Sequence, residues 1–160
     1  MNKINLLDIL KKYQSINVNL VWKDWKEAVF LSIKPLIDNN LVEPRYYDAV
    51  IKNTIEYGPY YIISENLAMP LRTQSDAGVK ENSFSLITLK SPVYFEGDER
   101  PVRVLIALAA TSAEIHTSEA LPQIVAIFED NNNLEKIINA KTSDEIIEII
   151  SKIDFQKYLI

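Results

Sequence analysis

The most constraining feature of this sequence is an apolar run near its middle, over residues 102–109. It reads Val-Arg-Val-Leu-Ile-Ala-Leu-Ala, so Arg103 is its single charged residue. A run of this length and composition favours a β-strand, and a strand without polar alternation needs cover on both faces. The run therefore predicts an α/β protein in which a β-sheet lies between two layers of helices.

Other segments complete this prediction. Residues 60–63 and 84–89 are β-prone and predict further strands. The chain before Gly58 and the chain after residue 120 are predicted to be helical, because their apolar residues recur at helical spacing. Two capping-box patterns, Asp24 with Glu27 and Thr142 with Glu145, mark helix starts. The tryptophans and tyrosines are interpreted as core packing rather than as a ligand platform.

The charged segment 96–101, Glu-Gly-Asp-Glu-Arg-Pro, separates the two longest predicted strands. A calcium loop is one alternative for it, but the acidic residues lack the regular ligand spacing of such a loop. A solvated hairpin connection is the better interpretation. The chain shows no internal repeat and no interdomain linker, so its 160 residues predict one domain that spans residues 1–160.

Composition excludes several kinds of site and partner. The sequence has no cysteine and one histidine, His116, so thiolate sites and zinc sites with several imidazoles are excluded, and no metal or cofactor is predicted. A net charge of −5 argues against nucleic acid or anionic lipid as the main partner. The three glycines form no phosphate-cradling loop, and neither Ser112 nor Ser118 lies in a nucleophile elbow.

No apolar run approaches the roughly 20 residues that are needed to cross a bilayer. The first 14 residues mix Lys3, Asp8, Lys11 and Lys12 with apolar residues, and they lack the cleavage site of a secretory signal. The sequence therefore predicts a cytoplasmic protein.

A series of short strings, in a fixed order between residues 25 and 150, carries a family resemblance. They are Glu43-Pro44-Arg45-Tyr46-Tyr47-Asp48-Ala49, Tyr57-Gly58-Pro59-Tyr60, Leu67-Ala68-Met69-Pro70, Gly78-Val79-Lys80, Phe84-Ser85-Leu86-Ile87-Thr88-Leu89-Lys90-Ser91-Pro92-Val93, Ala109-Ala110-Thr111 and His116. Their order and spacing resemble the IIA (EIIA) components of the bacterial phosphotransferase system (PTS), in the mannitol/fructose superfamily and closest to its ascorbate-type branch. The resemblance implies the EIIA type-2 fold, a single domain with a mixed β-sheet sandwiched between helices.

The resemblance also implies a place in a phosphoryl relay. EIIA components accept a phosphoryl group from HPr, which enzyme I charges with phosphoenolpyruvate, and pass it to a cysteine of an EIIB partner. EIIB then phosphorylates a sugar as it enters through a membrane EIIC permease. In this chemistry a neutral imidazole attacks the phosphorus, and nearby donors stabilise the charge of the transferred group. The implied partners are HPr and EIIB, with EIIC as an indirect partner.

The family's phosphoacceptor motif, A-[hydrophobic]-P-H-[small], is present here without its histidine. Ala68-Met69-Pro70 are in place, but Leu71 stands in the histidine position and has no lone pair. Asn66 stands where the family usually has glycine, and Arg72 where it has a small residue. Three clustered departures favour natural divergence over a single engineered substitution.

His116 falls where the family has its second histidine, and the resemblance implies that this histidine donates a hydrogen bond to the phosphoryl group. Judged without the resemblance, His116 fits a partly exposed imidazole that caps a nearby helix equally well. Arg72 and His116 together are candidates for holding an anion, although a solvated surface arginine is the simpler interpretation of Arg72.

Two functions follow from these residues. The favoured one is an EIIA-like component with a degenerate active site, which docks HPr, EIIB or a regulator without carrying a phosphoryl group on residue 71. The alternative is an active phosphoryl carrier from HPr to EIIB that uses His116 as its acceptor.

Overall fold

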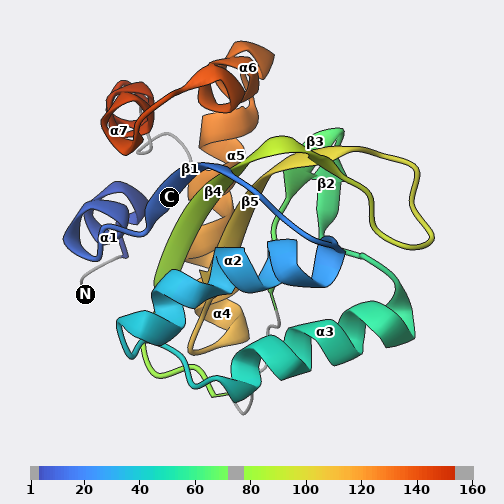
Figure 1. Cartoon of the computed structure of the whole chain (residues 1–160). Helices are drawn as coiled ribbons and strands as arrows, with labels where there is room; N and C mark the ends of the chain where they lie inside the picture. The colour runs from blue at the N-terminus through green and yellow to red at the C-terminus, as the bar shows by residue number, and fades with distance from the viewer. Residues whose placement is uncertain (1–3, 72–77, 154–160) are drawn as a thin grey trace.

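The computed structural model describes residues 4–71 and 78–153, and a five-stranded sheet with the order β1-β4-β5-β3-β2 lies at its centre (Figure 1). The strands are β1 (Ile16–Leu20), β2 (Ile62–Ser64), β3 (Asn66–Ala68), β4 (Ser83–Val93) and β5 (Val102–Ala109). β4 and β5 are antiparallel, whereas β1 runs parallel to β4 and β3 runs parallel to β5. The sheet is therefore mixed.

β5 is the middle strand of the sheet, and it occupies the predicted apolar run. Each of residues 104–109 is at most 1% exposed, as a strand covered on both faces should be. The charged segment 96–101 lies in the hairpin between β4 and β5, which confirms the hairpin interpretation. Within it, Arg100 pairs with Asp98 at 2.7 Å, and this hydrogen-bonded guanidinium lowers the pKa of Asp98 to about 2.

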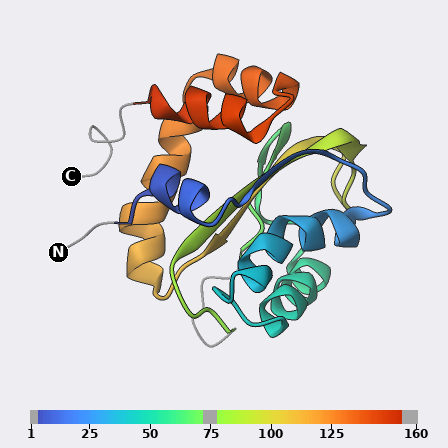
Figure 2. The ribbon, with the colours of Figure 1, turned by 60° about the vertical axis from the view of Figure 1, so that its left-hand side comes forward.

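Helices cover both faces of the sheet. On one face α2 (Trp25–Asp38) packs on β4 and β5, and α3 (Arg45–Tyr57) packs against α2 (Figure 1). On the other side lie α1 (Leu6–Lys12), α5 (Leu121–Phe128), α6 (Asn131–Asn139) and α7 (Ser143–Ser151), as Figure 2 shows with the sheet between the two layers. The predicted α/β fold class, with a mixed sheet between helices, is confirmed. Within residues 4–71 and 78–153, no helix is long and apolar enough to cross a membrane.

Both predicted capping residues begin helices. The Asp24 carboxylate accepts a hydrogen bond from the N–H of Glu27 at 2.8 Å, and α2 starts at the next residue. Thr142 Oγ1 accepts from the N–H of Glu145 at 3.2 Å, and α7 follows. These caps satisfy backbone donors that the first turn of a helix leaves without partners.

The prediction of helices before Gly58 missed one strand, because residues 16–20 form β1. In β1 the buried Ile16 is followed by exposed Asn17, half-buried Val18 and exposed Asn19. This alternation is typical of a strand, but the segment is short, and its pairing with β4 depends on residues about 70 positions away. The strand predicted at residues 60–63 is also displaced, because β2 begins at Ile62.

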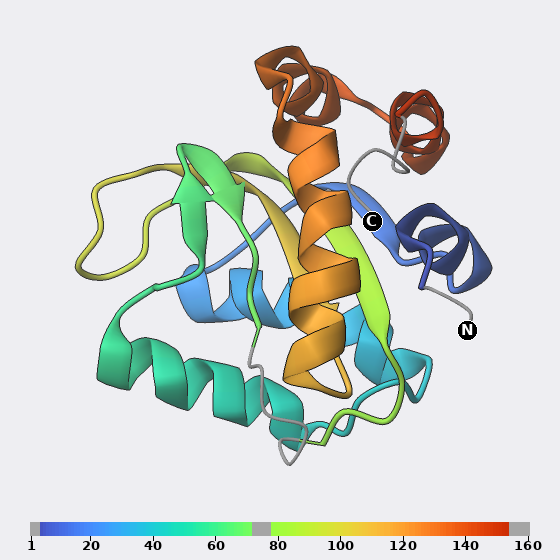
Figure 3. The same cartoon turned by 180° about the vertical axis from the view of Figure 1, so that it is seen from behind.

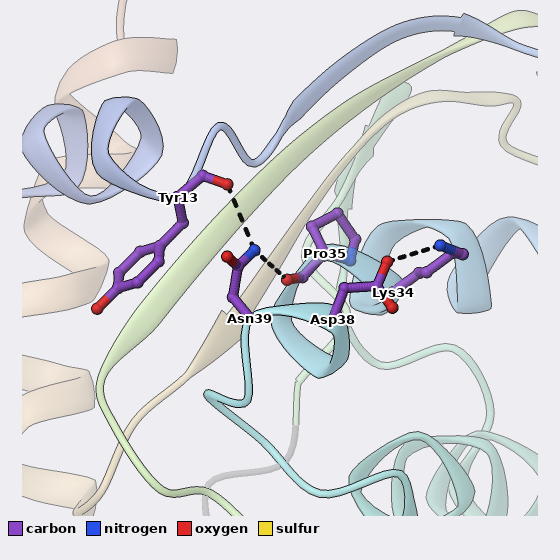
Figure 4. A network of polar contacts seen from close by, with 5 residues as sticks. All are labelled: Tyr13, Lys34, Pro35, Asp38 and Asn39. Atoms are coloured by element: carbon purple, nitrogen blue, oxygen red, sulfur yellow. Dashed lines mark hydrogen bonds and ion pairs between the residues drawn. The ribbon is translucent and has the colours of Figure 1, made fainter.

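One polar network joins the elements that lead into β1 and out of α2 (Figure 4). Asn39 Nδ2 donates to the C=O of Tyr13 at 3.3 Å and to the C=O of Pro35 at 2.7 Å. Beside it, Lys34 pairs with Asp38 at 2.6 Å on the exposed side of α2. The amide of Asn39 thus holds the end of α2 beside the turn from which the chain enters β1.

Candidate functional site

Residues 66–71 run beside β5 and reach its last residues. β3 pairs with β5 in parallel, and an isolated bridge continues this pairing at Leu71, opposite Leu108. The N–H of Leu108 donates to the C=O of Pro70 at 3.3 Å. The motif Ala68-Met69-Pro70-Leu71 therefore extends the sheet, and position 71 lies where β5 ends.

Two tyrosine hydroxyls hold the backbone on the two sides of this bridge. The Tyr60 hydroxyl donates to the C=O of Leu71 at 2.6 Å, and the Tyr46 hydroxyl donates to the C=O of Leu108 at 2.6 Å. Tyr46 comes from α3 and is fully buried, whereas Tyr60 precedes β2 and is 47% exposed. The interpretation of the tyrosines as core packing fits Tyr46. That interpretation did not predict the hydrogen bonds that the Tyr46 and Tyr60 hydroxyls make. The one sequence signal for them is that both tyrosines lie in the strings that carry the family resemblance.

The side chain of Leu71 is part of the hydrophobic core. It is 6% exposed and belongs to the same buried cluster as Leu67 and Met69. Burial of a leucine side chain contributes about 1.5–3 kcal/mol. Position 71 is thus filled by a group that stabilises the fold and that has neither a lone pair nor a transferable proton.

The backbone of Asn66 adopts a conformation that favours glycine. Its φ is 69°, in the left-handed region, and its N–H donates to the C=O of Pro101 at 2.6 Å. Asparagine tolerates this region better than other residues with a side chain. The expected glycine at position 66 stays a prediction, and the φ of Asn66 is one that glycine also adopts without strain.

His116 lies inside the helical segment that follows β5. That segment consists of α4 (Ala113–Ile115), the π-helix η2 (His116–Ala120) and α5. Ser112 caps its start, since Ser112 Oγ accepts from the N–H of Ile115 at 3.1 Å. The alternative in which His116 is a partly exposed cap is therefore wrong. The N–H of His116 itself donates to the C=O of Ser112 at 3.1 Å, as in a helix interior.

His116 is 9% exposed. Burial lowers the pKa of His116 below its ordinary value of 6.5, because the charged form loses hydration. The neutral form of the imidazole therefore predominates at pH 7. A neutral imidazole has one nitrogen with a free lone pair and one N–H, so it can either accept or donate a proton.

The structure brings position 71 and His116 to the same end of the sheet. Leu71 is bridged to Leu108, the residue before the end of β5, and His116 lies in the helical segment that begins after β5. Figure 3 shows this helical segment starting at the end of the sheet where β5 finishes. Arg72 lies outside the described residues, so its contact with an anion stays a prediction.

The loop between β5 and α4 is held by a side chain that the sequence did not single out. Asn82 Oδ1 accepts from the N–H of Thr111 at 2.8 Å and from its hydroxyl at 3.1 Å. Asn82 immediately precedes β4, so the bond ties the start of β4 to the loop that leads to His116. Asparagine is common in the loops that precede strands, and no sequence signal distinguishes Asn82 from the other asparagines of this chain.

Comparison with known proteins places this arrangement in a family. An Escherichia coli complex of mannitol enzyme IIA and phosphorylated enzyme IIB shares the fold, with a TM-score of 0.75 over 86% of this chain and 94% of that chain at 20% identity. A crystal structure of a PTS IIA protein from Streptococcus mutans is much more similar, with a TM-score of 0.91 and 46% sequence identity. The match covers 98% of this chain and 99% of the Streptococcus mutans chain.

Sequence comparison agrees with the structural one. A protein named ascorbate-specific PTS system EIIA component, from Mycoplasma pneumoniae, is 45% identical over 159 residues, which are 99% of both chains. The family model described as phosphoenolpyruvate-dependent sugar phosphotransferase system, EIIA 2, matches residues 9–153. The chain therefore belongs to the EIIA type-2 family of the phosphoenolpyruvate-dependent sugar phosphotransferase system.

Proposed function

We propose that this protein is the EIIA component of an ascorbate-type PTS, and that it docks PTS proteins in the cytoplasm without carrying a phosphoryl group on residue 71. The ascorbate assignment is supported by the Mycoplasma pneumoniae relative, which is similar over nearly the whole chain and is named for ascorbate. The loss of the carrier function is an inference from the chemistry of the site.

The observation that carries this proposal is the state of Leu71. The backbone at this position is held by the bridge to Leu108 and by the Tyr60 hydroxyl, so the position itself is maintained. Its side chain is apolar and buried in the core. Phosphoryl transfer requires a nucleophile with a lone pair that a partner can reach. A buried leucine meets neither requirement.

The second candidate function is phosphoryl transfer through His116. One observation favours it: the lowered pKa keeps the imidazole neutral, which is the form that attacks phosphorus. Burial argues against it, because His116 is only 9% exposed. The phosphoryl donor would be another protein, and its phosphoryl group would have to come into contact with the imidazole ring. We therefore place docking without transfer first.

The partners in this proposal are HPr and EIIB, with the EIIC permease as an indirect partner. Membership of the family supports both direct partners. A mannitol enzyme IIA of the same fold has been solved in complex with phosphorylated enzyme IIB, which supports EIIB as a partner. Docking surfaces are carried by the scaffold rather than by one side chain, so they can persist after the acceptor is lost.

A titration tests this function. Calorimetric titration of the protein with HPr and with EIIB is expected to show binding to at least one of them. Intact-mass measurement of the same protein, after incubation with enzyme I, HPr and phosphoenolpyruvate, is expected to show no phosphoryl adduct. Absence of binding to both proteins would refute the docking function.

A further inference from the structure

We propose that Tyr60 is a positioning residue for position 71, and that its hydroxyl keeps the backbone of this position in place against the end of β5. The inference rests on the proposed function, in which position 71 is the family's phosphoacceptor position. It assigns to Tyr60 a role at that site which does not depend on the side chain that occupies position 71.

The need for such a residue follows from Pro70. A proline has no N–H, so it cannot donate to a neighbouring strand and weakens the pairing at its position. The pairing of this segment with β5 continues past Ala68 through the N–H of Leu108, which donates to Pro70, and through the bridge at Leu71. The Tyr60 hydroxyl bonds the next carbonyl along the chain, that of Leu71, at 2.6 Å.

The Tyr60 ring is itself held by a buried neighbour. It packs edge-to-face against Tyr61, with ring centroids 5.0 Å apart and an interplanar angle of 72°. Tyr61 is 3% exposed, and its hydroxyl lies 2.7 Å from Thr54 Oγ1. Because Thr54 Oγ1 donates its own proton to the C=O of Val50, Tyr61 is the donor in this pair. The Tyr60 hydroxyl thus extends from an aromatic pair anchored on α3.

Positioning matters here because phosphoryl transfer depends on geometry. A nucleophile that is displaced by about 1 Å loses much of the advantage of orientation. The backbone at position 71 is bonded on one side through β5 and on the other through Tyr60. A histidine introduced at position 71 would therefore start from a fixed backbone, and loss of the Tyr60 hydroxyl would loosen that backbone.

Hydrogen exchange tests the anchoring in the protein as it stands. The Tyr60→Phe variant keeps the ring and removes the hydroxyl, and Tyr94→Phe, at a tyrosine that is 57% exposed, is the matched control. The N–H of Leu108, which donates to Pro70, should exchange about threefold to tenfold faster in Tyr60→Phe, the range expected for loss of one hydrogen bond. Equal exchange in the two variants would overturn the proposal.

Phosphoryl acceptance tests the positioning role, in proteins that also carry Leu71→His. In this reaction the P–N bond of phosphorylated HPr breaks as a P–N bond to the introduced imidazole forms. Adding Tyr60→Phe should lower the maximal rate about threefold to tenfold and leave the half-saturating concentration of phosphorylated HPr unchanged. Adding Tyr94→Phe should change neither quantity.

The outcomes separate this inference from the proposed function. Faster exchange at Leu108 with an unchanged maximal rate would show that the Tyr60 bond is structural, and would overturn the positioning role. If Leu71→His accepts no phosphoryl group, the assignment of position 71 in the proposed function is wrong. In that case the exchange experiment still decides whether Tyr60 anchors the backbone.

Discussion

The side chain of Gln123 holds the backbone of Leu6, because its Oε1 accepts a hydrogen bond from the N–H of Leu6 at 2.7 Å. Its Nε2 donates to the C=O of Ile4 at 2.9 Å, and the N–H of Ile4 donates to Glu119 Oε1 at 2.8 Å. The start of the described chain is thereby attached to the helical segment that contains His116. Residues 4–8 lie before the part of the chain that matches the family model, which begins at residue 9.

Replacing Gln123 should destabilise the protein. The side chain is 1% exposed, so Gln123→Met would leave the N–H of Leu6 and the C=O of Ile4 without their partner in a buried setting. We expect the free energy of unfolding to fall by about 1–3 kcal/mol. Urea denaturation measures this change. The exposed Lys52→Ala on α3 is the control, expected to stay within about 0.5 kcal/mol of the parent protein.

The hydroxyl of Tyr46 should also contribute to stability. It donates to the C=O of Leu108 in a fully buried position. Tyr46→Phe is expected to lower the free energy of unfolding by about 1–3 kcal/mol, because a buried carbonyl loses its donor. Tyr94→Phe, at an exposed tyrosine, should be near neutral in the same denaturation experiment. Equal stabilities of the two variants would contradict this account.

The left-handed backbone of Asn66 gives a third prediction. Its φ of 69° is accessible to glycine without strain, whereas a β-branched residue is strained there. Asn66→Gly should leave the free energy of unfolding nearly unchanged, whereas Asn66→Val should lower it by about 1–3 kcal/mol. Thermal or urea denaturation of the two variants measures their relative stability. If Asn66→Val is as stable as Asn66→Gly, the prediction is refuted.

The titration of His116 can be followed directly, because it is the only histidine in the sequence. Burial lowers its pKa below 6.5 in the folded protein. Just below pH 6.5 the unfolded chain therefore binds more protons than the folded protein. As the pH falls through this range, His116 makes the free energy of unfolding decline. The decline ends below the pKa of His116 in the folded protein. NMR titration of the imidazole should give a pKa below 6.5, and His116→Gln should remove this part of the pH dependence of stability.

The features that were predicted from the sequence are those encoded locally. The apolar run at 102–109 fixes a covered strand, and Asp24 and Thr142 cap helices a few residues away in the chain. β1 was not predicted, because its pairing with β4 is non-local and its five residues carry a weak signal.

The candidate site also has some features that could be predicted from the sequence and others that depend on the fold. The motif around Leu71 was recognisable as a string of residues, but its burial and the hydroxyl bond from Tyr60 depend on how β2 and β3 fold back along β5. The sequence equally fitted His116 as a helix cap, whereas Ser112 takes that role and His116 is a buried residue within the helical segment. Caps and strands can be predicted from neighbours in the chain, while contacts across the sheet require the fold.

The most direct test of the central claim is the intact mass of the wild-type protein and of Leu71→His, each incubated with phosphoenolpyruvate, enzyme I and HPr. We predict no phosphoryl adduct on the wild-type protein, because position 71 is a buried leucine, and one adduct on Leu71→His, because the backbone of that position is maintained. A phosphoryl adduct on the wild-type protein that disappears in His116→Gln would contradict the account and establish His116 as the acceptor.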